Sequence, residues 1–177
     1  DVYTGDWQHD IQNGRGIYKF QNGDIYEGSY VEGERTGEGI FKYANGDKYT
    51  GTFKEGDKEG FGSLLWANGD TYIGNWEQDK QTGKGKLIKK NGDFFEGTFL
   101  QGKLNGEVIV HYANGNRFKG FYANGMRNGK AIEEDKNGIR FEGNYNDDNR
   151  DGEFIEKDRN GTIKKKGRYE RGKRIEY

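Results

Sequence analysis

The sequence predicts an all-β fold, a single-layer antiparallel meander of tandem 23-residue β-hairpin repeats that is elongated, curved and solenoid-like. The first observation is an Asn-Gly pair that recurs every 23 residues. The pairs are Asn22-Gly23, Asn45-Gly46, Asn68-Gly69, Asn91-Gly92, Asn114-Gly115, Asn137-Gly138 and Asn160-Gly161. The second is an aromatic–x–Gly–x–aromatic pattern with the same period. Self-similarity at one fixed period indicates an array of one small unit.

The aromatic pattern predicts the first strand of each repeat. The repeats begin at Tyr3, Tyr26, Tyr49, Tyr72, Phe95, Phe118 and Phe141. In a strand, residues i, i+2 and i+4 lie on one face, so the two rings and the glycine share a face. The residues between them are mostly polar, which is the alternation of a half-buried strand.

The remainder of each repeat predicts a loop, a second strand and a tight turn. The loop is expected to end in a second repeated glycine, such as Gly14 or Gly37. The second strand is expected over 17–20, 40–43, 64–66 and 108–112. Asn-Gly favours a two-residue type I′ turn, which needs positive φ at both central residues. Each repeat then advances the sheet by roughly 10 Å, which predicts an arc of about 70 Å.

Residues 1–177 are expected to form one array, with seven full repeats and a partial C-terminal repeat from about Lys165. Gly167 and Tyr169 are one residue out of step, so a bulge or frayed end is expected over 162–166. The chain begins at Asp1 without Met, which is typical of an excised fragment and leaves upstream targeting open.

Composition narrows the function. The net charge is −1, so no basic field favours nucleic acid. No apolar run is long enough to span a membrane, and cysteine is absent, which suits a cytoplasmic protein. His9 and His111 are too far apart in the array to share a site. We therefore expect no catalytic residues, no metal and no cofactor. A calcium-like run, 147–158, is assigned to the repeat instead, because Gly152 is the ordinary repeat glycine.

The pattern resembles the MORN repeat (membrane occupation and recognition nexus). Tyr26-Glu27-Gly28-Ser29-Tyr30, Gly37-Glu38-Gly39 and Asn45-Gly46 follow the family pattern position by position. The resemblance implies an array of hairpins used for assembly or recognition. Such arrays occur in cytoskeletal, ciliary and junctional proteins and beside lipid kinases or methyltransferases. In this chain the second glycine of the Gly-x-Gly motif becomes Val108, Ala131 and Phe154, so the regular pattern weakens from about residue 130.

An aromatic stripe and its acidic end are the candidate partner-binding groove. The stripe consists of Phe20, Tyr43, Trp66 and Tyr112, and the acidic end of Glu133, Asp135, Glu156 and Asp158. The rings either form the core of a thin sheet or line an open groove for an amphipathic helix or extended peptide. The acidic end either caps the array or docks a basic segment.

The C-terminal stretch is basic and is the candidate membrane-binding segment. It contains Lys164, Lys165, Lys166, Arg168, Arg171, Lys173 and Arg174. Near an anionic membrane each such residue contributes about 1 kcal/mol. The alternatives are a solvated terminus or pairing with the acidic end of another copy.

The leading hypothesis is a non-catalytic scaffold that binds a protein partner in a cytoskeletal, ciliary or membrane-associated assembly. The alternatives are an adaptor for phosphoinositides or other anionic lipids, and the targeting module of a larger enzyme. A homodimer through an open end of the array is also expected, because sheet edges are templates for pairing.

Overall fold

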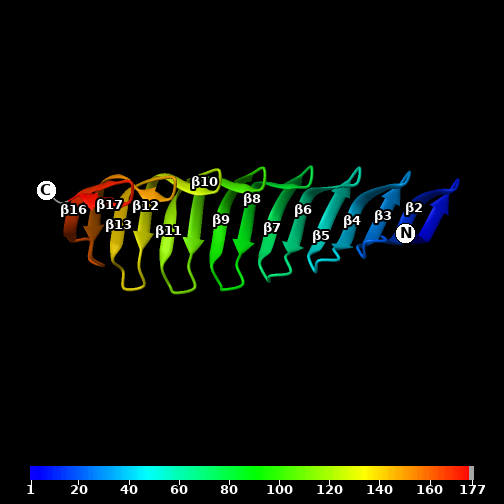
Figure 1. The fold of residues 1–177 in the computed structure, drawn as a ribbon, viewed down its shortest axis with the longest axis horizontal. Helices are drawn as coiled ribbons and strands as arrows, with labels where there is room; N and C mark the ends of the chain where they lie inside the picture. The colour runs from blue at the N-terminus through cyan, green and yellow to red at the C-terminus, as the bar shows by residue number, and fades with distance from the viewer. Residues whose placement is uncertain (176–177) are drawn as a thin grey trace. The chain divides into compact units, whose positions relative to one another are not determined.

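The computed structural model describes residues 1–175 and contains strands and turns throughout that part of the chain (Figure 1). It confirms the predicted all-β architecture, in which successive antiparallel strands form tandem hairpins in a single open layer. Residues 1–175 contain no helix that is long and apolar enough to cross a membrane. The structure divides into two units, Asp1–Lys90 and the part from Asn91 onward, and each is described by itself.

In the first unit, eight strands follow one another along the sheet, each antiparallel to the next. They are β1 (Val2–Gln8), β2 (Ile11–Lys19), β3 (Ile25–Val31), β4 (Glu34–Lys42), β5 (Lys48–Lys54), β6 (Asp57–Leu65), β7 (Thr71–Glu77) and β8 (Lys80–Ile88).

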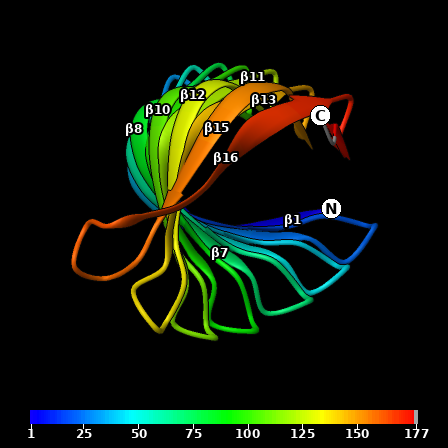
Figure 2. The same cartoon turned by 90° about the vertical axis from the view of Figure 1, so that its left-hand side faces the viewer.

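The second unit continues the same pattern and becomes less regular toward its end. Its strands are β9 (Phe94–Leu100), β10 (Lys103–His111), β11 (Arg117–Ala123), β12 (Met126–Glu134), β13 (Arg140–Asn146), β14 (Asn149–Arg150), β15 (Gly152–Lys157), β16 (Ile163–Glu170) and β17 (Lys173–Ile175). Figure 2 shows that β13, β15 and β16 bend along their length. The expected irregularity over 162–166 is a bulge, since Glu156 lies opposite Lys165 but Lys157 lies opposite Ile163.

One face of the sheet, here called the ring face, carries the repeated aromatics and is the core of each unit. Tyr26 and Tyr30 are 0% and 4% exposed. Their rings meet edge to face with centroids 5.3 Å apart, and Tyr30 makes the same contact at 5.3 Å with Tyr3 of the preceding repeat. Each repeat therefore buries a ring against its predecessor, which a lone hairpin could not do.

The glycines beside the first ring make room for it. A Cβ on Gly28 would lie 2.3 Å from the Tyr26 hydroxyl, and one on Gly39 would lie 2.6 Å from its ring. The ring lies across this glycine pair, and its hydroxyl donates to the Ser29 carbonyl at 3.0 Å. Burial raises the pKa of Tyr26 to about 12.

The predicted turn type is wrong for the Asn-Gly pairs. Gly46 N donates to the Tyr43 carbonyl at 3.0 Å, and Tyr43 N donates to the Asp47 carbonyl at 2.9 Å. Only Gly46 has positive φ, at 95°. This is a three-residue loop built on a type I turn with a G1 bulge. The Asn45 side chain accepts from Asp47 N at 2.9 Å, which fixes that arrangement.

The two-residue type I′ turns lie at the opposite end of each hairpin. At the turn between β3 and β4, Glu32 and Gly33 have φ of 49° and 82°. The predicted loop before the second strand is also wrong, because β4 begins at Glu34 directly after this turn. Gly37, with φ of 61°, lies inside β4 where the register with β3 shifts, so the repeated glycine serves a β-bulge.

A loop aspartate connects several repeats to the following one. Asp24 Oδ1 accepts a hydrogen bond from Ala44 N at 2.7 Å, and Asp47 Oδ1 accepts one from Ala67 N at 2.8 Å. Asp93 makes the same bond to Ala113 N at 2.9 Å in the second unit. Adjacent loops are therefore joined by side chains as well as by the strand ladder.

Candidate functional site

The ring face of the first unit carries three of the predicted groove residues. Phe20, Tyr43 and Trp66 directly follow β2, β4 and β6, and all three are half-buried. Tyr43 packs on the buried Phe41 with ring centroids 4.5 Å apart, and Phe20 lies 5.7 Å from the same ring. These rings extend the core and still leave part of their surface open.

Cationic side chains lie over several rings of the ring face. The sequence interpretation missed this feature. Arg35 lies 5.2 Å from the centroid of Phe41, and Lys58 lies 5.5 Å from that of Trp76. In the second unit Arg150 lies 3.9 Å from the Phe141 centroid. A cation over a ring face stabilises both by about 0.5–2 kcal/mol. The signal was available, because residues 35, 58, 127 and 150 occupy one place in the 23-residue repeat.

Lys58 also fixes one of the groove rings. Its Nζ donates to the Tyr43 hydroxyl at 3.0 Å and pairs with Asp79 at 3.0 Å. Burial alone would lower the pKa of Lys58, but the bonds to Tyr43 and Asp79 raise it above its ordinary value. The ammonium stays charged, so Tyr43 is held by a charge-assisted hydrogen bond.

In the second unit the structure brings four predicted residues to one pocket. Tyr112, Glu133, Asp135 and Glu156 line a cavity of about 200 Å³. Phe141 and Arg150 belong to the same wall. Burial raises the pKa of Tyr112, so its hydroxyl stays a donor at neutral pH.

The acidic residues of this region have partners within the chain. Glu133 pairs with Arg150 at 2.8 Å and also accepts from the Tyr145 hydroxyl. Glu156 pairs with Lys165 at 3.1 Å. Asp135 accepts from the backbone N–H groups of its own loop, at Asn137 and Ile139. These partners reduce the negative field that a basic segment would meet.

The basic stretch is the other half of these pairs. Lys164 pairs with Asp158 at 3.1 Å, so both Lys164 and Lys165 are bound to the acidic end of the same chain. Arg168 lies 3.7 Å from Glu170, and Arg174 lies 5.6 Å from the Phe154 centroid. Arg171 and Lys173 are exposed. Lys166 lines the groove that is described in the next paragraph.

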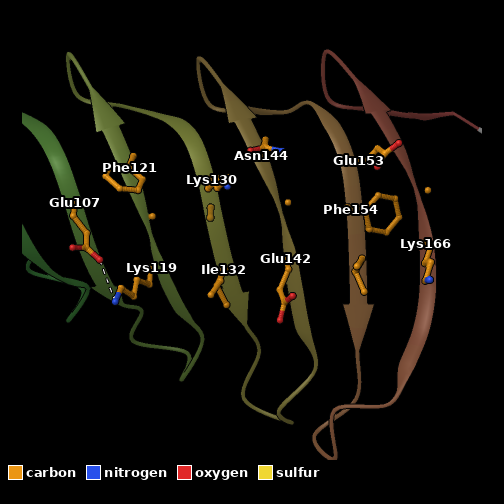
Figure 3. Close-up of a pocket in the computed structure, with 15 residues that line it drawn as sticks. Glu107, Lys119, Phe121, Lys130, Ile132, Glu142, Asn144, Glu153, Phe154 and Lys166 are labelled. Carbon is orange, nitrogen blue, oxygen red and sulfur yellow. Dashed lines mark ion pairs between the residues drawn. The ribbon is translucent and has the colours of Figure 1, made fainter.

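A large groove lies on the face opposite the ring face, in the second unit (Figure 3). It is a groove of about 860 Å³ that crosses β10, β11, β12, β13, β15 and β16. Phe121, Ile132 and Ile155 supply apolar side chains, and Phe121 is 50% exposed. The backbone of Gly120, Gly143 and Gly167 forms part of the floor. Charged side chains, among them Lys119, Lys130, Glu142 and Glu153, stand along the groove.

The sequence interpretation missed this groove because it treated the face opposite the rings as uniformly polar. A signal was present in the period. Isoleucine recurs at one opposite-face place of the 23-residue repeat, at Ile17, Ile40, Ile109, Ile132 and Ile155. Within the second unit, Ile132 and Ile155 line the groove and Ile109 lies next to it across the ladder.

No group of three or more potential metal-binding side chains occurs within residues 1–175. The calcium-like run is part of a hairpin. Asp147 and Asp148 occupy the two central places of its turn, with φ of 45° and 66°.

Solved structures of similar fold are found at low sequence identity. The TCP domain of SAS-4 (dCPAP) from Drosophila melanogaster, solved with a proline-rich motif of Ana2 (dSTIL), has a TM-score of 0.56 at 15% identity, covering 85% of this chain and 81% of that one. The TCP10c domain of Drosophila melanogaster Sas-4 has a TM-score of 0.50 at 16% identity, covering 85% and 90%. The G-box domain of the microcephaly protein CPAP has a TM-score of 0.50 at 13% identity, covering 85% and 84%. At this identity the likeness shows a shared fold.

Among curated proteins the search finds no match. The family model for the MORN repeat matches six consecutive stretches. They are residues 3–25, 26–48, 49–71, 72–94, 95–117 and 118–140. These stretches begin at the aromatic residues that begin the first six predicted repeats, one residue after the first strand of each hairpin begins, and they leave no gap between 3 and 140. The chain belongs to the MORN repeat family.

Proposed function

We propose that this chain is a non-catalytic scaffold that binds a segment of a partner protein on its ring face, in a cytoskeletal assembly of the cytoplasm. The observation that carries the proposal is the row of half-buried rings at Phe20, Tyr43 and Trp66. The first and second rings of the repeats that they flank are almost fully buried, as Tyr26, Phe53 and Tyr72 are. Rings that keep an open edge beside polar groups are typical anchors for a partner.

Two further points support this proposal. Tyr43 is pre-oriented by Lys58, so less side-chain entropy is lost on binding. A domain of similar fold, the SAS-4 TCP domain, was solved in complex with a proline-rich motif of Ana2, and a role in centriole elongation has been suggested for the G-box domain of CPAP. An open single layer of this kind can therefore take up a peptide segment.

The test uses peptides selected from a random display library on the purified chain. The selected peptides are here called ring-face peptides. Their affinity for the double variant Tyr43→Ala, Trp66→Ala should be at least about tenfold lower, which is about 1.4 kcal/mol. Phe61→Ala is the matched control, because Phe61 is an exposed ring of the same unit on the opposite face. Circular dichroism checks that each variant stays folded. Unchanged affinity in a folded double variant would contradict the proposal.

A further inference from the structure

We infer that the groove on the opposite face of the second unit is a separate docking site for an extended, acidic segment of a partner protein in the polyproline II conformation. The inference does not depend on the ring face, because most of the lining side chains, such as those of Lys119, Phe121 and Ile132, alternate along the strands with buried ring-face residues. It rests on the dimensions of the groove, on the spacing of its apolar side chains and on its unpaired charges.

The length and direction of the groove suit an extended chain. The groove crosses six strands, so it is about 24 Å long at the usual spacing between strands. About eight residues of an extended segment, at about 3.1 Å each, span that length. An α-helix lying in the same direction presents a side chain to the sheet at every turn, about every 5.4 Å, which is close to one side chain for every strand.

The spacing of the isoleucines indicates the conformation of the bound segment. Across the ladder, Ile109 lies opposite Lys119, which lies opposite Ile132. Glu142 lies opposite both Ile132 and Ile155, so the isoleucines occur on every second strand. Two strand spacings are about 9.6 Å. A polyproline II helix repeats every three residues at 3.1 Å each, about 9.3 Å.

Other extended conformations do not match this spacing. In a β-strand the residues on one side repeat every two positions, at about 6.6 Å. A strand lying across the groove would therefore meet an isoleucine with one side chain and a charged residue with the next. The polyproline II segment places an apolar side chain on each isoleucine in turn. Its intervening residues face Lys119, Glu142 and Lys166, which alternate with the isoleucines along the row.

The charges of the groove favour an acidic segment. Glu107 is paired with Lys119 at 3.1 Å, and Glu142 with Lys157 at 2.9 Å. Among the described residues, the exposed side chains of Lys130, Lys166 and Glu153 make no ion pair. Two free ammonium groups against one carboxylate leave a positive balance. The polyproline II backbone has no internal hydrogen bonds, so its carbonyls are also free to accept from these lysines.

The test measures fluorescence anisotropy with labelled synthetic peptides on the full chain. The first has leucine at every third position in a proline-rich frame with two aspartates. The second has the same composition with leucine at every second position, and the third replaces each proline of the first by glycine. We expect the first to bind at least about tenfold more tightly than either of the others. Equal binding of all three, or no saturable binding of the first, would overturn the inference.

Variants locate the site. Ile132→Glu should weaken binding of the first peptide at least tenfold, and Ile155→Thr, which keeps a strand-forming residue, should weaken it in the same direction. Ile40→Glu is the matched control, because Ile40 occupies the same place of the repeat in the first unit, outside the groove. Replacing both Lys130 and Lys166 by alanine should weaken the acidic peptide more than a version with asparagine in place of aspartate.

The ring-face variant separates this inference from the proposed function. The folded double variant Tyr43→Ala, Trp66→Ala should bind the first peptide with unchanged affinity. If that variant loses the peptide while Ile132→Glu keeps it, the peptide binds the ring face, and the groove inference is overturned while the proposed function stands. If Ile132→Glu loses the peptide and the ring-face peptides bind every variant equally, the proposed function fails alone.

Discussion

The pairing of tyrosine with glycine explains why the repeats change along the chain. In the first four repeats, the first ring is a tyrosine and lies across two glycines, as Tyr49 does on Gly51 and Gly62. Its hydroxyl donates to a backbone carbonyl, that of Thr52, at 3.0 Å. From Phe95 onward the first ring has no hydroxyl. The second glycine is then replaced by Val108, Ala131 and Phe154, each of which is buried. A shorter ring leaves space that a side chain fills.

This relation predicts coupling between the two positions. Gly62→Ala should destabilise the chain by about 1–3 kcal/mol, because the new Cβ would lie 2.3 Å from the Tyr49 hydroxyl. Tyr49→Phe should lose the bond to Thr52, at a cost of about 1 kcal/mol. The double variant removes the contact with the hydroxyl but keeps those with ring carbons Cε2 and Cζ at 2.6 Å, so it should recover only part of the steric cost, about 0.5 kcal/mol. Urea unfolding of the four proteins measures the coupling, and strict additivity would refute the steric explanation.

At the scale of the element, the loop aspartates hold adjacent hairpins in register. Asp70 is the most buried of them, at 7% exposed. It accepts from Lys90 N at 2.9 Å and from Asn68 at 3.1 Å, and it pairs with Lys89. Lys89 occupies the place that Phe20, Tyr43 and Trp66 hold in earlier repeats, so the aromatic row is interrupted here by an ion pair.

The environment of Asp70 predicts an acid-sensitive contribution to stability. The bond to Lys89, followed by that to Lys90 N, lowers the pKa of this carboxyl below its ordinary value of 3.8. A lowered native pKa stabilises the fold above that value, and the contribution is lost as pH falls through the native pKa. The melting temperature of the native chain should therefore exceed that of Asp70→Asn near neutral pH and approach it below pH 3.8.

Asp24→Asn is the matched control for this measurement. Asp24 bonds to Ala44 N in the same way but has a tyrosine, Tyr43, where Asp70 has Lys89. A difference between native chain and Asp70→Asn that stays constant down to strongly acid pH would rule out the ion pair as its cause.

Turn chemistry shows where sequence reasoning reached its limit at this scale. The positions of the Asn-Gly turns followed from the period, but their type did not. Asn-Gly serves both a type I′ turn and a type I turn with a G1 bulge, so the pair alone does not decide between them. At the other end, His9-Asp10 and Gln78-Asp79 form two-residue turns with positive φ and without any glycine. Side chains that tolerate positive φ there give a weak sequence signal.

At the scale of the whole molecule, the repeat period predicted the architecture and the ring face, but not the groove on the opposite face. A single layer has two faces, and rings identify the buried one. The groove beside Ile132 depends on how strands of the second unit bend and on which lysines remain unpaired, and neither is visible in the spacing of residues. The acidic and basic stretches were both recognised, but their mutual pairing, as Lys165 with Glu156, needed coordinates.

The distribution of charge predicts weak association with lipid. The net charge is −1, and Lys164 and Lys165 are already bound to Asp158 and Glu156. Co-sedimentation with anionic vesicles should therefore not exceed that with neutral vesicles at physiological salt. The double variant Asp158→Asn, Glu156→Gln releases both lysines and should increase binding to anionic vesicles at low salt. Strong binding by the native chain that disappears when Lys164 and Lys165 are replaced by alanine would favour the lipid alternative instead.

The loop aspartate that reaches forward to the next repeat has a consequence for how such chains change length. Asp24, Asp47 and Asp93 each bond to a backbone N–H twenty residues later, so the loops at these places bond to the loop of the following repeat in the same way. Excising residues 49–71, one of the matched stretches, would bring Asp47 into the place of Asp70 and leave a complementary junction. One whole 23-residue repeat can thus be removed, and the repeats on either side still fit each other.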